Sequence, residues 1–202
     1  MHTIDLDSGA SQEISRFVTS AADRIPSRLD MRLADEALGR GEGLLPVLTD
    51  SINEFPARGV LVKGLPRFDD VERTKILTLL VADAVGRLTA YADYNASILT
   101  DIRPNPGSNE QNAQPQRLGM HNDFPFIADG VRPCFIILTT HIAEGAVPKT
   151  LLAPANEIVA ALDADTIECL QQLRYSAVVG AKLAWAQSKR YTFPLMIRQG
   201  QR

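Results

Sequence analysis

The sequence changes character at Gly59, and this change limits the folds that the chain can adopt. Before it, the apolar residues at 14, 17, 18, 21, 22 and 25 recur at the spacing of one helix face. After it, short apolar runs bounded by glycine and proline are typical of strands. Helices followed by several short strands predict an α+β domain built on a β-sandwich or barrel, and they exclude the regular strand–helix alternation of a Rossmann fold.

Helices are expected where apolar periodicity meets a capping residue. The strongest helix begins at Asp69, with Glu72 three residues later, and it ends at Gly86. Its expected core stripe is Leu77, Leu80, Val81, Ala84 and Val85. The other expected helices span residues 14–25, 27–39, 44–55, 155–162 and 165–173.

Strands are expected where short apolar or alternating runs occur. The short apolar run at 59–66, bounded by glycine and proline, predicts a buried strand. His2 is expected to lie in a frayed terminus. The polar loop at 104–116 is long enough to favour a lid or binding loop over a connector. The remaining expected strands span residues 97–103, 118–123, 134–141, 150–152 and 191–197.

Charge and cysteine content exclude several classes of function. The chain has 21 basic and 24 acidic side chains, so a net charge of −3 gives no electrostatic case for nucleic-acid binding. Cys134 and Cys169 are too few for a disulfide scaffold and fit a reducing compartment. The first residues lack the pattern of a signal peptide, and no apolar run is long enough to span a bilayer. We therefore expect a soluble, cytoplasmic protein with no nucleic-acid or membrane partner.

The pattern His121-Asn122-Asp123 carries the strongest chemical signal. Side chains two apart on a strand point to the same face, so an imidazole and a carboxylate could both face one metal ion. Two histidines and one carboxylate form the facial triad that holds non-haem Fe(II) with open positions for oxygen and substrate. The short pattern alone also fits an ordinary surface histidine beside an acid.

Four segments in and around this pattern carry a family resemblance. They are residues 59–66, residues 99–104, residues 121–133 with Arg132-Pro133, and residues 149–152. In this order and spacing, over roughly residues 55–175, they resemble the clavaminate synthase-like and taurine dioxygenase-like iron(II)/2-oxoglutarate oxygenases. The resemblance is greatest to the branch that hydroxylates free amino acids.

The resemblance implies a role for several residues. His121 and Asp123 would be the catalytic iron ligands, although many members of the branch carry Glu at the position of Asp123. Thr150 would hydrogen-bond the cosubstrate 2-oxoglutarate, and its other interpretation is a β-branched residue that suits a strand. The substrate, an amino acid or a related small molecule, would be bound by Phe124, Phe126, Asn109 and Gln111, for which core packing and a mobile loop are the other interpretation.

The implied fold is a double-stranded β-helix, or jelly roll. Residues 1–202 would form a single oxygenase-like domain, with N-terminal helices over 1–56 and a partial jelly-roll core over 57–202. A partial barrel exposes strand edges and apolar interior, which favours association. A homodimer or a complementary chain is therefore expected.

The sequence departs from the family late in the chain. The family's second histidine ligand and its 2-oxoglutarate arginine lie in the last barrel strands, but only His141 follows His121, and it is interpreted as a sheet or loop histidine. Three interpretations stay open: part of a longer or split enzyme, a shortened homologue that acts as a binding or assembly partner, and an unusual site completed by His141 or Glu144. The candidates for the arginine that binds 2-oxoglutarate are Arg190, Arg198 and Arg202. None of them lies in a motif that matches the family.

Overall fold

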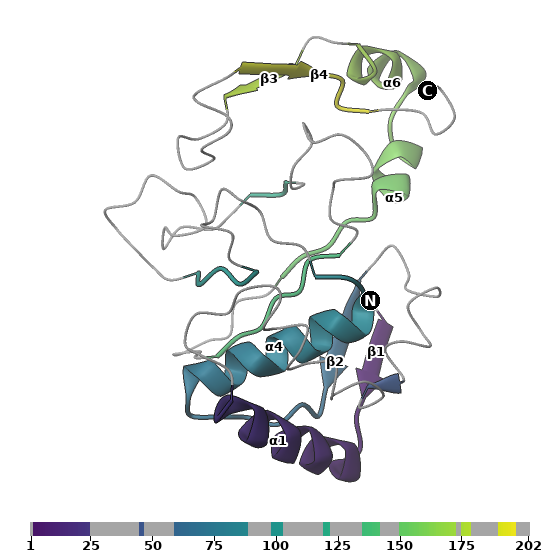
Figure 1. Ribbon diagram of the computed structural model, residues 1–202. Helices are drawn as coiled ribbons and strands as arrows, with labels where there is room; N and C mark the ends of the chain where they lie inside the picture. The colour runs from purple at the N-terminus through teal and green to yellow at the C-terminus, as the bar shows by residue number, and fades with distance from the viewer. Residues whose placement is uncertain are drawn as a thin grey trace. The chain divides into compact units, whose positions relative to one another are not determined.

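The computed structural model in Figure 1 divides the chain into two compact units, which are described separately. The first unit contains Met1–Tyr91, Ala96–Ile98 and Pro133–Pro154, and the second contains the rest. Both units hold helices and strands, a mixture that is compatible with the expected α+β class. The structure describes residues 2–24, 45–46, 59–88, 98–102, 119–121, 135–141, 150–172, 175–178 and 190–196.

The first unit holds a parallel pair of strands, β1 (His2–Asp5) and β2 (Val60–Lys63). The His2 N–H donates to the Gly59 carbonyl oxygen at 3.2 Å, and the Leu6 N–H donates to the last residue of β2 at 3.0 Å. Parallel strands need a long crossover connection, and the connection from β1 to β2 includes a helix. The expectation of a frayed terminus at His2 is therefore wrong, because backbone pairing orders it.

Two glycines in the left-handed region flank β2. Gly59 has φ 74° and Gly64 has φ 79°. A Cβ at Gly64 would collide with the carbonyl oxygen of Leu6, so the close approach of these two backbone segments requires glycine at this position. These positions explain why the glycines of the sequence mark the bounds of the strand. Within the strand Val60 and Val62 are half-buried and Leu61 is exposed, so the expectation of a buried strand is wrong.

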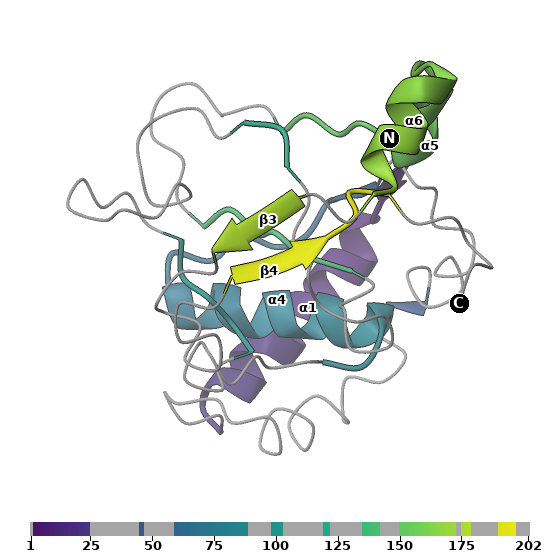
Figure 2. The ribbon, with the colours of Figure 1, turned by 90° about the horizontal axis from the view of Figure 1, so that it is seen from above.

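Two long helices supply most of the core of the first unit. They are α1 (Ser8–Ala22) and α4 (Val71–Val85), which lie side by side (Figures 1 and 2). Asp7 is the N-cap of α1, and its carboxylate accepts the Ala10 N–H at 2.8 Å, so the helix starts at Ser8, six residues before its first buried side chain, Ile14. The core of the two helices consists of Ile14, Val18, Ala21, Ile76, Leu77, Leu79, Leu80, Val81 and Val85.

The start of α4 differs by one residue from the expectation. Asp70, rather than Asp69, caps the helix, and its carboxylate accepts the Glu72 N–H at 2.9 Å. At the other end the Gly86 N–H donates to the Ala82 carbonyl oxygen at 3.0 Å, as the sequence predicts for a helix that ends at Gly86. The expected stripe is buried except for Ala84, which is half-buried.

The second unit contains two short helices and an antiparallel strand pair. The helices, α5 (Ala155–Ala160) and α6 (Ala164–Leu170), lie where the sequence predicts them. β4 (Arg190–Phe193) confirms the first part of the last expected strand, and residues 194–196 are not strand. β4 pairs with β3 (Tyr175–Val178), which was not expected from the sequence (Figure 2). After β4, the Met196 N–H donates to the carbonyl oxygen of Leu170 at 3.1 Å, which attaches the chain to the end of α6.

The cap of α6 predicts a pH dependence. The Asp163 carboxylate accepts the Thr166 N–H at 2.7 Å and the Thr166 hydroxyl at 2.9 Å, and these bonds hold the pKa of Asp163 below its ordinary value of 3.8. Because the folded pKa is lowered, the cap stabilises α6 above the ordinary pKa and is lost as the pH falls through the folded one. We expect the protection of the Thr166 amide from exchange, relative to its unfolded rate, to fall as the pH drops below 3.8, and we expect Asp163→Asn to remove this pH dependence. An unchanged profile in Asp163→Asn would contradict this role.

Four other expected strands are wrong within the described residues. Residues 98–102, 119–121, 135–141 and 150–154 contain no strand. An alternating or β-branched pattern reports that side chains suit a pleated surface, but a strand also requires a hydrogen-bonded neighbour, which the pattern does not specify.

Two expected helices, over 27–39 and 44–55, lie outside the described residues except for Leu45 and Pro46, and of these Leu45 is buried. None of the helices in the described part of the chain is long and apolar enough to cross a membrane.

Candidate functional site

His121 is the described member of the expected iron motif, and a backbone contact fixes its ring. Its Nδ1 lies 2.8 Å from the carbonyl oxygen of Gly119. A carbonyl oxygen can only accept, so Nδ1 carries the proton, and in the neutral ring Nε2 carries the lone pair. Metal-binding histidines are commonly oriented by this kind of N–H bond to a carbonyl oxygen. In this tautomer the exposed His121 side chain can bind a metal through Nε2.

The other residues of the motif and of the substrate site stay predictions. The expected cosubstrate residue, Thr150, is exposed and lies in an irregular segment of the first unit, whereas His121 belongs to the second unit. Arg190 is the first residue of β4. The remaining candidates lie outside the described residues: Asp123, Phe124, Phe126, Asn109, Gln111, Glu144, Arg198 and Arg202.

The described residues contain one expected ligand rather than a full ligand set. Among them, no three His, Cys, Asp or Glu side chains lie close enough together to hold a metal ion. Of the two predicted iron ligands, the structure therefore describes His121 alone, and Asp123 lies outside the described residues.

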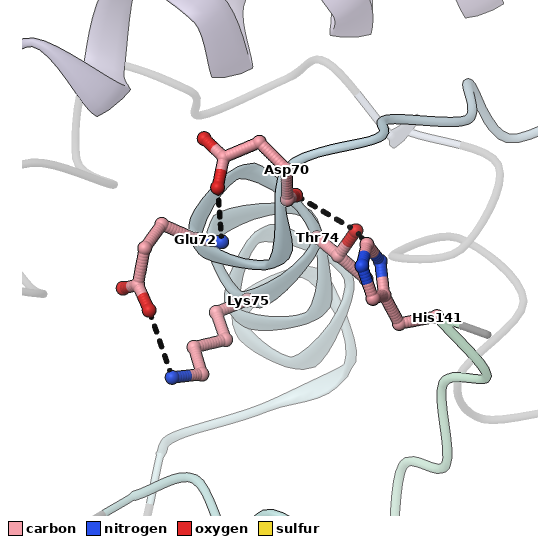
Figure 3. A network of polar contacts seen from close by, with 5 residues as sticks. All are labelled: Asp70, Glu72, Thr74, Lys75 and His141. Atoms are coloured by element: carbon pink, nitrogen blue, oxygen red, sulfur yellow. Dashed lines mark hydrogen bonds and ion pairs between the residues drawn. The ribbon is translucent and has the colours of Figure 1, made fainter.

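His141 lies in a different setting, against the first turn of α4 (Figure 3). Its Nδ1 is 2.8 Å from the hydroxyl oxygen of Thr74, a residue 67 positions earlier in the sequence. Thr74 is buried at 9 % exposure, and its hydroxyl also donates to the Asp70 carbonyl oxygen at 3.3 Å. The half-buried imidazole is thus bonded to a buried helix residue.

The charged side chains of this turn lie to the other side of the helix (Figure 3). The Lys75 Nζ is 2.9 Å from a Glu72 carboxylate oxygen, in a pair three residues apart. Both side chains are partly exposed, and pairs of this kind contribute only about 0.2–0.5 kcal/mol to a helix. Within this turn of the helix, the contact to His141 is therefore made by the hydroxyl of Thr74.

The contact between Thr74 and His141 has no local signal in the sequence. Thr74 falls within an apolar helix pattern, and the segment that carries His141 is expected as a strand. A polar residue at a core position of α4 is the one clue, since a buried hydroxyl needs a partner. The identity of that partner depends on tertiary structure.

Comparisons of the chain with models of protein families, with curated proteins and with solved structures found no match.

Proposed function

We propose that this protein is an iron(II)/2-oxoglutarate-dependent oxygenase that oxidises an unactivated C–H bond of a free amino acid or a related small molecule. The supporting observation from the structure is the ring of His121, whose Nδ1–H bond to Gly119 leaves the lone pair on Nε2. The His121-x-Asp123 pattern and the order of the four family-like segments support the same function. The proposed scaffold is the jelly-roll core that this resemblance implies.

The donor types fit the proposed metal. An imidazole nitrogen from His121 and a carboxylate from Asp123 are two of the three ligands in the facial triad that holds non-haem Fe(II). Iron and 2-oxoglutarate, when bound, supply the oxidation of a C–H bond with molecular oxygen.

The chain's own residues bind and orient in this proposal. The Gly119 carbonyl oxygen would keep the His121 ring from turning, because rotation would break the 2.8 Å bond. Thr150 would hold a carboxylate of the cosubstrate through its hydroxyl. Phe124 and Phe126 would exclude water from the substrate site, with Asn109 and Gln111 as polar contacts from the 104–116 loop.

Turnover of 2-oxoglutarate tests the function. With Fe(II), oxygen and a panel of free amino acids, we expect at least one amino acid to stimulate release of labelled CO₂ from 2-oxoglutarate. His121→Ala should lower the stimulated rate by about 100-fold or more, since even outer contacts of metal ligands cost 10–100-fold. His2→Ala is a matched control, because His2 is an exposed histidine on β1, and its rate should be unchanged.

The outcome also addresses the alternative of a binding or assembly protein. This alternative is favoured by the position of the only histidine after His121, since His141 comes only 20 residues later and is bonded to Thr74. A folded protein that releases no CO₂ with any amino acid, alone or with a complementary chain, would support the alternative over the oxygenase.

A further inference from the structure

We propose that His141 is a fastening residue, which holds residues 135–141 to helix α4 through the hydroxyl of Thr74. The two residues belong to the same compact unit, and their 2.8 Å contact spans 67 positions of sequence. Figure 3 shows the imidazole directly beside the Thr74 side chain at the start of the helix. This role goes beyond the proposed oxygenase function and does not depend on it.

The positions of the donors and acceptors define the proton arrangement. The Asp70 carbonyl oxygen can only accept, so the single hydroxyl proton of Thr74 is used for the 3.3 Å bond to it. The hydroxyl oxygen can then accept from His141, which requires the proton on Nδ1. Only the Nδ1–H form of the ring satisfies both contacts of the hydroxyl at once.

The burial of Thr74 gives the contact its energetic weight. At 9 % exposure, the hydroxyl is largely removed from water, and a buried hydroxyl that loses its partner is destabilising. The Asp70 carbonyl oxygen already accepts the Thr74 N–H at 3.2 Å, so it is shared between two donors. The bond to His141 is the shorter of the two that the hydroxyl makes.

The segment that carries His141 gains little from apolar burial. Of its large apolar side chains, Phe135, Ile136 and Leu138 are exposed at 43, 53 and 71 %, and Ile137 is half-buried. Stabilisation by the hydrophobic effect scales with the apolar area removed from water. The contact of His141 with Thr74 therefore attaches the segment to α4 by a polar bond, where its exposed apolar side chains contribute little.

A double-mutant cycle measures the proposed coupling. Thr74→Val removes the hydroxyl and keeps the shape, and His141→Ala removes the ring. In urea unfolding without metal, we expect each single variant to lower the folding equilibrium constant by roughly fivefold. The double variant should lower it by about the same factor as one single variant does. Additive losses within about twofold would overturn the proposal.

Thr78→Val is the matched control on the same helix. The Thr78 hydroxyl donates to the Thr74 carbonyl oxygen at 2.8 Å, one turn further along, so the substitution removes a similar group away from His141. Its effect should add to that of His141→Ala within about twofold. Coupling of equal size in this control cycle would contradict a specific bond.

Two further readouts separate fastening from metal binding. Nitrogen-15 spectra of the neutral imidazole should show His141 protonated at Nδ1, and protonation at Nε2 alone would contradict the arrangement. Fe(II) affinity should be the same within about twofold in wild type and His141→Ala. A large loss of Fe(II) affinity in His141→Ala but not in Thr74→Val would make His141 a ligand and would overturn the proposal. These results stay distinct from a failure of the oxygenase function, because the unfolding cycle uses no metal.

Discussion

Replacing Ile14 with alanine is expected to lower the free energy of unfolding by about 2–5 kcal/mol. Ile14 is fully buried at 0 % exposure on α1, which packs against α4. The substitution removes three carbon atoms from this contact and leaves a cavity, because a close-packed core relaxes only in part. Urea denaturation followed by circular dichroism measures the loss, which is a large share of the stability of an ordinary domain.

Ile158→Ala is the matched control for this substitution. Ile158 lies on α5 in the second unit and is 48 % exposed, so the same chemical change leaves no closed cavity. We expect a loss below about 1 kcal/mol. Equal losses in the two variants would show that the contact of α1 with α4 is not the centre of the stable core.

The second large effect concerns metal binding. His121→Ala is expected to weaken Fe(II) binding by about 100-fold or more, since it removes a ligand outright and not only an outer contact. The ring is exposed and its tautomer is set by Gly119, so the substitution should leave the fold unchanged. Anaerobic titration with Fe(II), read by calorimetry, measures the dissociation constant.

His2→Ala again serves as the comparison. An exposed histidine outside the motif should bind Fe(II) only weakly, and its removal should leave the dissociation constant unchanged. If His121→Ala and His2→Ala behaved alike, any iron binding would be adventitious, and His121 would be an ordinary surface histidine.

The helices could be predicted because their signals are local. Apolar periodicity places Ile14 and Val18 on one face of α1, and Gly86 marks the end of α4 in the sequence and in the structure. The errors lie at the helix ends: α1 spans Ser8–Ala22 where residues 14–25 were expected, and α4 is capped by Asp70 where Asp69 was expected. A cap depends on the backbone angles of one residue, which the pattern of side chains does not determine.

The strands were predicted less well because pairing is not local. β1 contains one buried apolar residue, Ile4, and it is ordered by a partner more than fifty positions away. Conversely, residues 135–140 have the composition of a strand, yet no strand forms there. Composition reports the fit of side chains to a sheet, and tertiary structure supplies the hydrogen-bonded neighbour.

The candidate site shows the same division between local and tertiary signals. The pattern His121-x-Asp123 could be found by inspection, whereas the tautomer of His121 depends on the position of the Gly119 carbonyl oxygen. The partner of His141 could not be predicted, because a polar residue at a core position shows only that Thr74 needs a partner and not which residue it is. The residue types of a motif therefore suggest which ligand they could bind. The position of a backbone carbonyl oxygen determines which ring nitrogen of a histidine carries the proton.

The most direct test of the oxygenase proposal is an absorption spectrum. Under anaerobic conditions, wild-type protein with Fe(II) and 2-oxoglutarate should show a weak visible charge-transfer band, and the band should disappear in His121→Ala and persist in His2→Ala. If the folded wild-type protein gives no band, with or without a complementary chain, or if the band survives in His121→Ala, the proposed iron site at His121 is wrong.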